Sequence, residues 1–340
     1  MDATTAGPGP RNLITDVPGL RVGQADDARV RTGVTVILPD ERAVCGCDVR
    51  GGGPGTRETD ALAPENLVDA VDAVVLSGGS VYGLAAADGV VAWLGARGRG
   101  YGLASGIPPS PVVPGAILFD MANGGDKAWG EDPPYRDLGR RAVVDAGLEI
   151  ALGTAGAGYG AMAGSLKGGT GSASALSADG FTVGAIVAVN SWGSVVAPGG
   201  RTFWAAPFEI DAEFGGLGAS GLAAAPDDWG LAKRPLDTRN TTIACVATDA
   251  ILTPAQARRV AIMAQAGLAR AIRPVFAPFD GDVVFALSTG QKALSALADY
   301  DVARLGALAA DTLARAVARG VFEATPWPDA PVSCWRDLSQ

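Results

Sequence analysis

The stretch NTTIACVATDA, residues 240–250, joins a long irregular segment to a predicted buried strand. Residues 243–248 (IACVAT) are β-branched or small and apolar, which is typical of a strand inside a sheet. The preceding residues, from about 199 to 240, are rich in Gly, Ala, Pro and Asp and show no sustained hydrophobic period. An irregular segment of this length is unusual in a compact chain and often functional. The junction between Asn240 and Thr241 is therefore a candidate site as well as a boundary between structural elements.

Elsewhere the chain mixes short apolar runs with amphipathic stretches. β-branched content and flanking glycines predict strands at residues 33–38, 73–76, 116–119, 181–189, 194–196, 243–248 and 282–287. Helices are predicted at residues 81–94, 136–146, 254–272 and 301–319. The third helix begins with a cap at Thr253, a proline at its first position, and Gln256 three residues after the cap. This mixture predicts an α/β or α+β fold.

Composition places the chain among folded globular proteins. Of its 340 residues 48% are hydrophobic and 19% are charged, which allows one large α/β domain or two ordinary ones. The net charge of −9, from 27 basic and 36 acidic residues, argues against a nucleic-acid or anionic-membrane partner. The first residues lack an apolar signal core, and no segment offers 18 uncharged apolar residues. We therefore expect a soluble, cytoplasmic protein.

The sequence contains no histidine. This excludes a Ser-His-Asp triad, a Cys-His pair and every metal site that needs imidazole. A zinc site would require all four cysteines, Cys45, Cys47, Cys245 and Cys334, to converge, and reduced, packed thiols are the simpler interpretation. An enzyme built from this chain therefore needs a different base near neutral pH.

Three glycine-containing motifs have both functional and structural interpretations. Residues 156–161 (GAGYGA), with Asp179 further on, outline a dinucleotide fingerprint, but glycines interrupt the helix that should follow. Residues 77–80 (SGGS) lie where backbone N–H groups can bind an anion, yet they lack the Gly-Lys-Ser/Thr ending of a phosphate loop. Asp280 and Asp282 could hold a cation, although the rest of a calcium loop is missing. Backbone packing is the favoured interpretation of the two glycine loops, and a turn with solvated acids explains Asp280 and Asp282 equally well.

The junction offers a chemistry that does not need histidine. If the Thr241 hydroxyl attacks the Asn240 carbonyl, an ester forms, and water then releases Thr241 as a new N-terminus. The freed α-amino group, with an ordinary pKa of about 7.7–8, is a base near neutral pH. A terminal threonine activated by its own amine is a known nucleophile arrangement. An Asn-Thr pair alone is common, and a loop that enters a strand would explain it.

Several motifs in addition to the junction resemble one family, the self-cleaving aminopeptidases and nylon-oligomer hydrolases. That family includes the L-aminopeptidase D-amidase/esterase, the β-peptidyl aminopeptidases and the 6-aminohexanoate-oligomer endohydrolase. The matching stretches, in the family's order, are DVRGGGPGTRETD (48–60), LSGGSVYGL (76–84), LKGGTG (166–171), NTTI (240–243), VATDA (246–250) and FDGDVVFA (279–286). The resemblance covers roughly residues 12–325.

The resemblance implies a four-layer helix–sheet–sheet–helix sandwich, shared with ornithine acetyltransferase. It implies a single catalytic domain, 1–340, that cuts itself into chains of residues 1–240 and 241–340, which stay associated. It also implies a ring-like homo-oligomer, commonly a tetramer of such pairs. No metal or organic cofactor is expected.

Site residues follow from the matched motifs. The resemblance implies Thr241 as nucleophile, Asn190 as the oxyanion-stabilising group, and Asp280 and Asp282 as the acids around the new amino terminus. Lys167 matches the family's active-site lysine, with Ser165 as the alternative for that position. In this arrangement an acid near the ammonium raises its pKa and a nearby lysine lowers it.

The substrate is indicated less directly. Phe119 stands where the nylon-oligomer enzymes have a tyrosine, so a hydrogen bond to the substrate amide is either absent or supplied by Tyr82. A threonine nucleophile resembles the nylon-oligomer branch, whereas the aminopeptidases use serine. We expect a hydrolase of small amides with a free amino end: peptides, β-peptides or ω-amino-acid oligomers. An acyltransferase, an uncleaved binding protein of the same fold and a nucleotide-binding enzyme are the alternatives.

Overall fold

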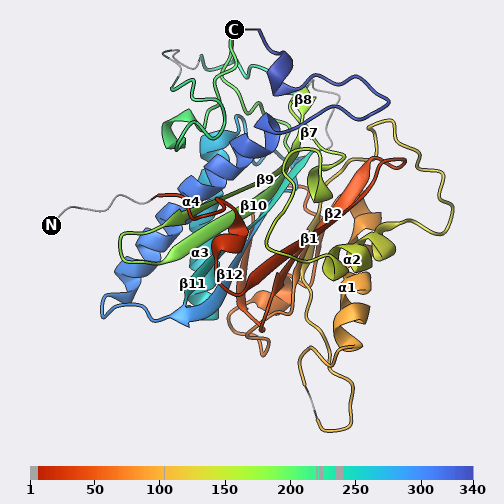
Figure 1. Cartoon of the computed structure of the whole chain (residues 1–340), viewed down its shortest axis with the longest axis vertical. Helices are drawn as coiled ribbons and strands as arrows, with labels where there is room; N and C mark the ends of the chain where they lie inside the picture. Colours follow the sequence, from red (N-terminus) through yellow and green to blue (C-terminus); the bar gives the residue numbers. More distant parts are fainter. Residues whose placement is uncertain (1–6, 103, 220, 222–224, 234–239, 340) are drawn as a thin grey trace.

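The computed structural model describes residues 7–102, 104–219, 221, 225–233 and 240–339. Two five-stranded sheets form its centre (Figure 1). We call them sheet A and sheet B. Sheet A has the order β3 (Val44–Val49), β12 (Val283–Lys292), β11 (Thr241–Ala250), β10 (Thr182–Asn190) and β9 (Gly169–Leu176). Sheet B has the order β1 (Leu20–Asp27), β2 (Thr32–Pro39), β5 (Val74–Ser77), β6 (Gly115–Ile117) and β4 (Thr56–Arg57).

Helices cover the outer faces of both sheets. Figure 1 shows α3 (Pro254–Ala271) and α4 (Ala298–Phe322) on one side, and α1 (Ala86–Gly95) and α2 (Tyr135–Val144) on the other. One apolar core lies between sheet A and the pair α3 and α4, and another lies between sheet B and the pair α1 and α2. A third core fills the space between the sheets, with Ile37 and Leu76 of sheet B near Ile243 and Phe285 of sheet A. The predicted helix–sheet–sheet–helix sandwich is therefore confirmed.

Short elements complete the chain. A small hairpin consists of β7 (Met162–Ala163) and β8 (Leu166–Lys167). Six 3-10 turns are present among the described residues: η1 (Ile14–Asp16), η2 (Asp60–Leu62), η3 (Ser80–Ala85), η4 (Gly156–Gly158), η5 (Ala206–Phe208) and η6 (Trp335–Asp337).

The predicted elements differ from the structure in several places. The helix expected at residues 81–94 begins as the 3-10 turn η3 and becomes α-helical at Ala86. The strand expected at residues 194–196 is wrong, because Ser194 and Val196 make only isolated bridges, to Arg273 and Phe203. The predicted cap of α3 is present, with the Thr253 side chain accepting the N–H of Gln256.

β9 was not predicted, and its composition explains why. Its sequence, GTGSASAL, contains small residues that disfavour strands. They are needed because α4 packs directly on this strand: a Cβ at Gly171 would lie 1.9 Å from the Ala316 carbonyl oxygen. Tertiary packing has therefore overridden local strand preference.

The irregular segment from residue 199 is held against α4 by buried charges. Glu213 forms an ion pair with Arg315 of α4, and both side chains are nearly inaccessible to solvent. Arg315 also donates to the Ser174 carbonyl at 2.8 Å and to the Asn12 side chain at 2.9 Å. This network fixes the middle of a segment that later returns toward the start of β11.

Candidate active site

The junction between Asn240 and Thr241 is buried at the start of β11. Asn240 is 2% exposed and Thr241 is 4% exposed. The Thr241 hydroxyl donates a hydrogen bond to the Asn240 carbonyl oxygen, which also accepts the Gly281 N–H at 3.2 Å. The hydroxyl of the predicted nucleophile therefore lies beside a carbonyl that a backbone donor already polarises.

Gly281 must remain small for this contact. A Cβ at this position would lie 2.7 Å from the Thr241 hydroxyl oxygen and 2.8 Å from the Gly53 carbonyl oxygen. Both distances are shorter than ordinary packing contacts allow. The glycine between Asp280 and Asp282 thus permits the close approach of the turn to the junction.

Asn190 is the last residue of β10 and pairs with Thr241 across the antiparallel ladder. Its side-chain amide is fixed at both ends: Nδ2 donates to the Phe119 carbonyl at 3.0 Å, and Oδ1 accepts the Met162 N–H at 2.9 Å. The sheet register therefore places a rigid amide next to the predicted nucleophile. This location suits a group that stabilises negative charge on a reacting carbonyl.

Two carboxyl groups lie beneath the junction. Asp282 accepts the Thr242 N–H at 2.7 Å and the Phe276 N–H at 3.2 Å, and Asp280 accepts the Ala277 N–H at 3.0 Å. The second oxygen of Asp280, Oδ1, has no hydrogen-bond partner among the described residues. Burial, and secondarily the neighbouring Asp280 carboxyl, raise the pKa of Asp282 from 3.8 to about 7. Burial also raises the pKa of Asp280. A cation released at Thr241 would relieve this cost.

A cleft of about 710 Å³ lies next to Asn190. Its walls come from four separate parts of the chain: Phe119, Asp120, Ala122, Asn123, Gly160, Met162, Gly164, Ser165, Asn190, Gly230, Leu231, Ala232 and Lys233. The Lys233 ammonium donates to the Asn240 side-chain oxygen at 2.5 Å. The cleft is therefore connected to the junction through Lys233 as well as through Asn190.

Lys167 is completely buried on β8 and does not line this cleft. Its ammonium donates to the carbonyls of Gly168 at 2.7 Å, Ala161 at 3.1 Å and Gly158 at 3.3 Å. Burial lowers the pKa of Lys167 to about 7. These contacts hold the loop that carries Met162, which in turn binds the Asn190 side chain. Ser165, the alternative residue, is exposed and lines the cleft.

The two predicted substrate contacts lie in different surroundings. Phe119 lines the cleft, and its carbonyl holds Asn190. Tyr82 is 47% exposed on η3, where its ring contacts Trp129 edge to face at 5.6 Å. Within the described part of the chain, Tyr82 is not among the residues that line the cleft.

Sequence reasoning missed Lys233, Met162 and Gly281 as parts of the site. Lys233 is one of only four lysines in the chain and stands seven residues before Asn240, which is the one signal that could have pointed to it. Met162 and Gly281 act through backbone N–H groups, so their side chains carry no information about the role.

The other sequence motifs acquire structural explanations. Gly156–Gly158 forms the 3-10 turn η4, followed by the β7–β8 hairpin instead of the helix that a dinucleotide site needs.

None of the four cysteines, all in the described part of the chain, forms a disulfide. Searched over the described residues, the structure has no group of three Cys, Asp or Glu side chains arranged to hold a metal ion. No described helix is both long and apolar enough to cross a membrane.

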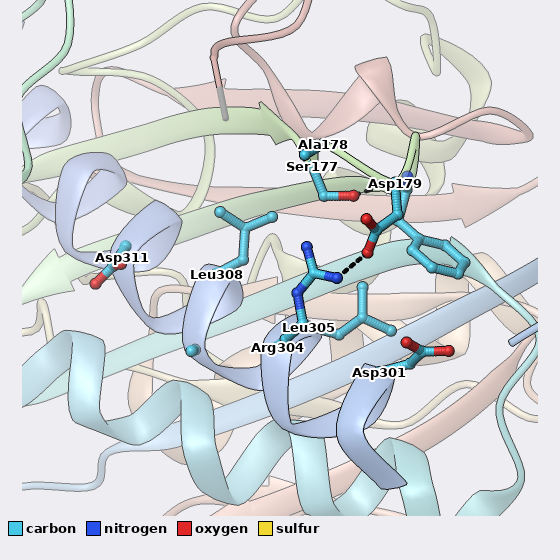
Figure 2. A pocket seen from close by; sticks show the side chains of 10 residues that line it. Ser177, Ala178, Asp179, Asp301, Arg304, Leu305, Leu308 and Asp311 are labelled. Carbon is cyan, nitrogen blue, oxygen red and sulfur yellow. Dashed lines mark hydrogen bonds and ion pairs between the residues drawn. The ribbon is translucent and has the colours of Figure 1, made fainter. Parts of the chain in front are cut away.

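A second hollow, of about 280 Å³, lies where the β9–β10 turn meets α4. Figure 2 shows Arg304 of α4 pointing toward Asp179 in that turn, with which it forms an ion pair. Thr182 and Asn190 are the opposite ends of β10, about 27 Å apart at the usual rise of a strand. This hollow is therefore remote from the junction and contains none of the predicted site residues.

Comparison with known proteins gives consistent matches. The model of peptidase family S58 matches residues 12–330. An uncharacterized aminopeptidase of Mycobacterium tuberculosis (strain ATCC 25618 / H37Rv) is 45% identical, over 96% of this chain and 98% of its own length. The 6-aminohexanoate-oligomer endohydrolase of Kocuria sp. (strain KY2) is 28% identical, over 83% of this chain and 76% of its own length.

Solved structures share the fold. The L-aminopeptidase D-Ala-esterase/amidase of Ochrobactrum anthropi, described as a variant of the Ntn hydrolase fold, superposes with a TM-score of 0.70 and 23% identity. The match covers 99% of this chain and 92% of that one. A β-aminopeptidase of Burkholderia sp. superposes with a TM-score of 0.69 and 23% identity, covering 95% and 90% of the two chains.

Proposed function

Because the chain belongs to peptidase family S58 and is an amide hydrolase, we propose that it cuts itself between Asn240 and Thr241 and then uses Thr241 as its nucleophile. The observation that carries the proposal is the buried contact of the Thr241 hydroxyl with the Asn240 carbonyl, which Gly281 N–H also contacts. Processing forms a bond from the hydroxyl oxygen to the carbonyl carbon and breaks the peptide bond. Water then hydrolyses the ester and leaves a carboxylate on Asn240.

The two pieces would stay together after the cut. Residues 1–240 contribute β3, β9 and β10 to sheet A, and residues 241–340 contribute β11 and β12. β11 pairs with β10 through eight residue pairs, and β3 pairs with β12 on the other side. Separating the pieces would open sheet A at two ladders and expose the cores on both of its faces. We also propose a tetramer of such pairs, which light scattering of the purified protein would test.

In turnover the freed α-amine of Thr241 accepts the hydroxyl proton while the hydroxyl oxygen attacks the substrate carbonyl. The Asn190 side chain donates to the developing oxyanion, a contribution of roughly 3–4 kcal/mol in comparable sites. The amine then gives its proton to the leaving amine, and water releases the acyl group. We propose that Asp280 and Asp282, which are buried near the junction, hold the ammonium form of Thr241.

We propose that the substrates are small amides or oligoamides with a free amino end. The names of the relatives support this class: one acts on 6-aminohexanoate oligomers, and others are aminopeptidases. Two buried carboxyl groups beside the nucleophile add an electrostatic reason, because they favour a cationic group nearby.

The test is to trap the acyl-enzyme. The protein is mixed with an amino-acyl p-nitroanilide, quenched in acid within the turnover time, digested and analysed by mass spectrometry. The acyl mass should lie on the peptide that begins with Thr241. Turnover with the acyl group on another residue would contradict the nucleophile. In Thr241→Ala we expect neither the cut nor the label, and cut material from that variant would refute the proposal.

A further inference from the structure

One wall of the cleft is built from the segment that leads to the junction. Residues 230–233 line it together with Phe119 and Asp120, and the Lys233 N–H donates to the Trp192 carbonyl at 2.9 Å. This backbone bond fixes where the Lys233 side chain begins. The ammonium group then extends to the Asn240 side chain, 2.5 Å from its carbonyl oxygen.

The contact between Lys233 and Asn240 is shielded from water on one side. Asn240 is 2% exposed, while Lys233 is partly exposed in the wall of the cleft. A hydrogen bond from a cation to a buried amide oxygen contributes more than a bond between neutral groups. The residue that precedes the nucleophile is thus recognised by its side chain as well as by its backbone.

Asn240 has a special status if the chain cuts itself, so this inference rests on the proposed function. During processing the Asn240 acyl group becomes an ester on the Thr241 hydroxyl oxygen. During turnover the substrate acyl group forms the same kind of ester on the same oxygen. Asn240 is therefore the first acyl residue that this nucleophile accepts, and its surroundings outline the acyl subsite.

We propose that Lys233 forms a specificity subsite for a side-chain oxygen acceptor on the acyl residue of the substrate. The preferred substrates are then amides whose amino-terminal residue carries a carboxamide or carboxylate at the position of the Asn240 side chain. The shared chemistry is an oxygen that accepts a hydrogen bond from the Lys233 ammonium.

Asp280, next to Asn240, gives a reason to expect a free amino group on the substrate. Asn240 and Asp280 form a parallel bridge, and Asp280 is 2% exposed with Oδ1 unpartnered among the described residues. The bridge sets the backbone of residue 240 beside that of Asp280, so we infer that the α-ammonium of a substrate binds near this carboxyl. The subsite thus presents an anion to the amino group and a cation to the side-chain oxygen of one residue.

The first test compares three substrates on processed protein: the p-nitroanilides of asparagine, aspartate and leucine. Leucine has nearly the shape of asparagine but no acceptor. We expect kcat/KM for asparagine to exceed that for leucine by about 10- to 100-fold, the usual effect of a hydrogen bond to a charged group. Aspartate should match or exceed asparagine if a carboxylate is the natural group, and fall below it if a carboxamide is.

Variants then assign the preference to Lys233. Lys233→Met should bring the asparagine-to-leucine ratio close to one, and Lys233→Arg should retain most of it. Lys292→Met is the matched control, because Lys292 lies at the other end of β12 from Asp282. The asparagine-to-leucine ratio of this variant should equal that of the unchanged protein. A ratio near one in the unchanged protein, or an unchanged ratio in Lys233→Met, would overturn the proposal.

A second test needs no added substrate and covers the case that Lys233→Met matures slowly. The rate of self-cleavage is measured by intact mass for Asn240→Leu, Lys233→Met and the double variant. Asn240→Leu should slow the cut by about tenfold when Lys233 is present and by less than about twofold in its absence. Additive effects would contradict the proposal. A chain that neither cuts itself nor cleaves any anilide would instead contradict the proposed function.

Discussion

Charged side chains at the two ends of sheet A differ in their exposure to solvent. At the end where β11 begins, Asp280 and Asp282 are almost inaccessible to solvent. At the other end, Asp179 and Arg304 form an ion pair with about two-fifths of each side chain exposed (Figure 2). Both ends have a hollow lined by polar groups. At the first end, burial raises the pKa of Asp280 and Asp282, which lie next to a hydroxyl in contact with a carbonyl.

The presence of a hollow is therefore a poor guide to the position of the site. A charged side chain at the exposed end is solvated by water and contributes little when paired. At the buried end, an ionised carboxyl is costly unless a positive charge arrives. The structure therefore stores an electrostatic cost at the start of β11 that a released amino group would reduce.

The largest effect is expected from the Asn190 side-chain amide, next to the proposed nucleophile Thr241. Asn190→Ala should lower kcat by about 10²–10³, because one oxyanion donor is removed. Steady-state kinetics with an amino-acyl p-nitroanilide, scaled to the amount of processed chain, measures it. Asp179→Asn at the other end of β10 is the control. Equal activity of Asn190→Ala and the unchanged protein would remove this amide from the mechanism.

Adding one methyl group beside the Thr241 hydroxyl should give the next largest effect. In Gly281→Ala the new Cβ meets the Thr241 hydroxyl oxygen at 2.7 Å, so the contact with Asn240 must shift. We expect self-cleavage to slow by about tenfold or more, in line with overpacking costs of about 1–3 kcal/mol. Gly200→Ala, where a Cβ would meet no atom within 4 Å, should cut at the normal rate. Normal cutting in both variants would show that the turn does not restrict the hydroxyl.

The pH dependence of the free energy of unfolding should reveal the contribution of Asp282. Its pKa in the folded chain, about 7, lies above the ordinary 3.8, so the folded state holds this proton more tightly than the unfolded state does. The resulting stabilisation is complete below about pH 4 and is lost as the pH rises through 7. The facing charged groups are Asp280 and, beyond it, Lys233.

The measurement uses the uncut Thr241→Ala protein, which has no new ammonium. Its free energy of unfolding, from urea titration, should fall between pH 5 and 8. The decrease with pH should be smaller in the double variant that combines Thr241→Ala with Asp282→Asn. Changes of roughly 1–3 kcal/mol are expected across that range. If the free energy of unfolding changes equally with pH in the two proteins, ionisation of Asp282 is not the source of the pH dependence.

The smallest effect is expected at the exposed end. Asp179→Asn breaks the ion pair with Arg304, but such surface pairs contribute about 0–1 kcal/mol. Thermal unfolding should change by only a few degrees, and self-cleavage should not change. A large loss of thermal stability or of self-cleavage in Asp179→Asn would contradict the difference proposed between the two ends of sheet A.

Much of the fold could be predicted because its central strands are apolar and its helices carry end signals. Residues 243–248 became part of β11, and Thr253 caps α3 as expected. β3 was missed because its glycine and polar residues weaken the strand pattern. Yet a Cβ at Gly46 would lie 2.2 Å from the backbone nitrogen of Arg258 in α3, so packing requires the glycine. Such requirements come from the partner element and leave no local signal.

The site shows the same division. Motifs indicated Thr241, Asn190, Asp280 and Asp282 as candidates, and sheet A with its turn brings all four to the end where β11 begins. Lys233 could not be placed, because an aperiodic segment gives no indication of where it returns. The position of Lys167 in the motif says nothing of its three carbonyl partners. Local chemistry is readable in sequence, whereas contacts made by irregular backbone are not.

The most direct test of the account is the denaturing intact mass of freshly purified protein. Self-cleavage at Asn240 predicts two species of about 24 and 10 kDa, in proportion to their shares of the 340-residue, 34.1 kDa chain. The smaller species should begin at Thr241. A single species of 34.1 kDa that nevertheless hydrolyses amides would contradict the claim that Thr241 acts as a terminal nucleophile.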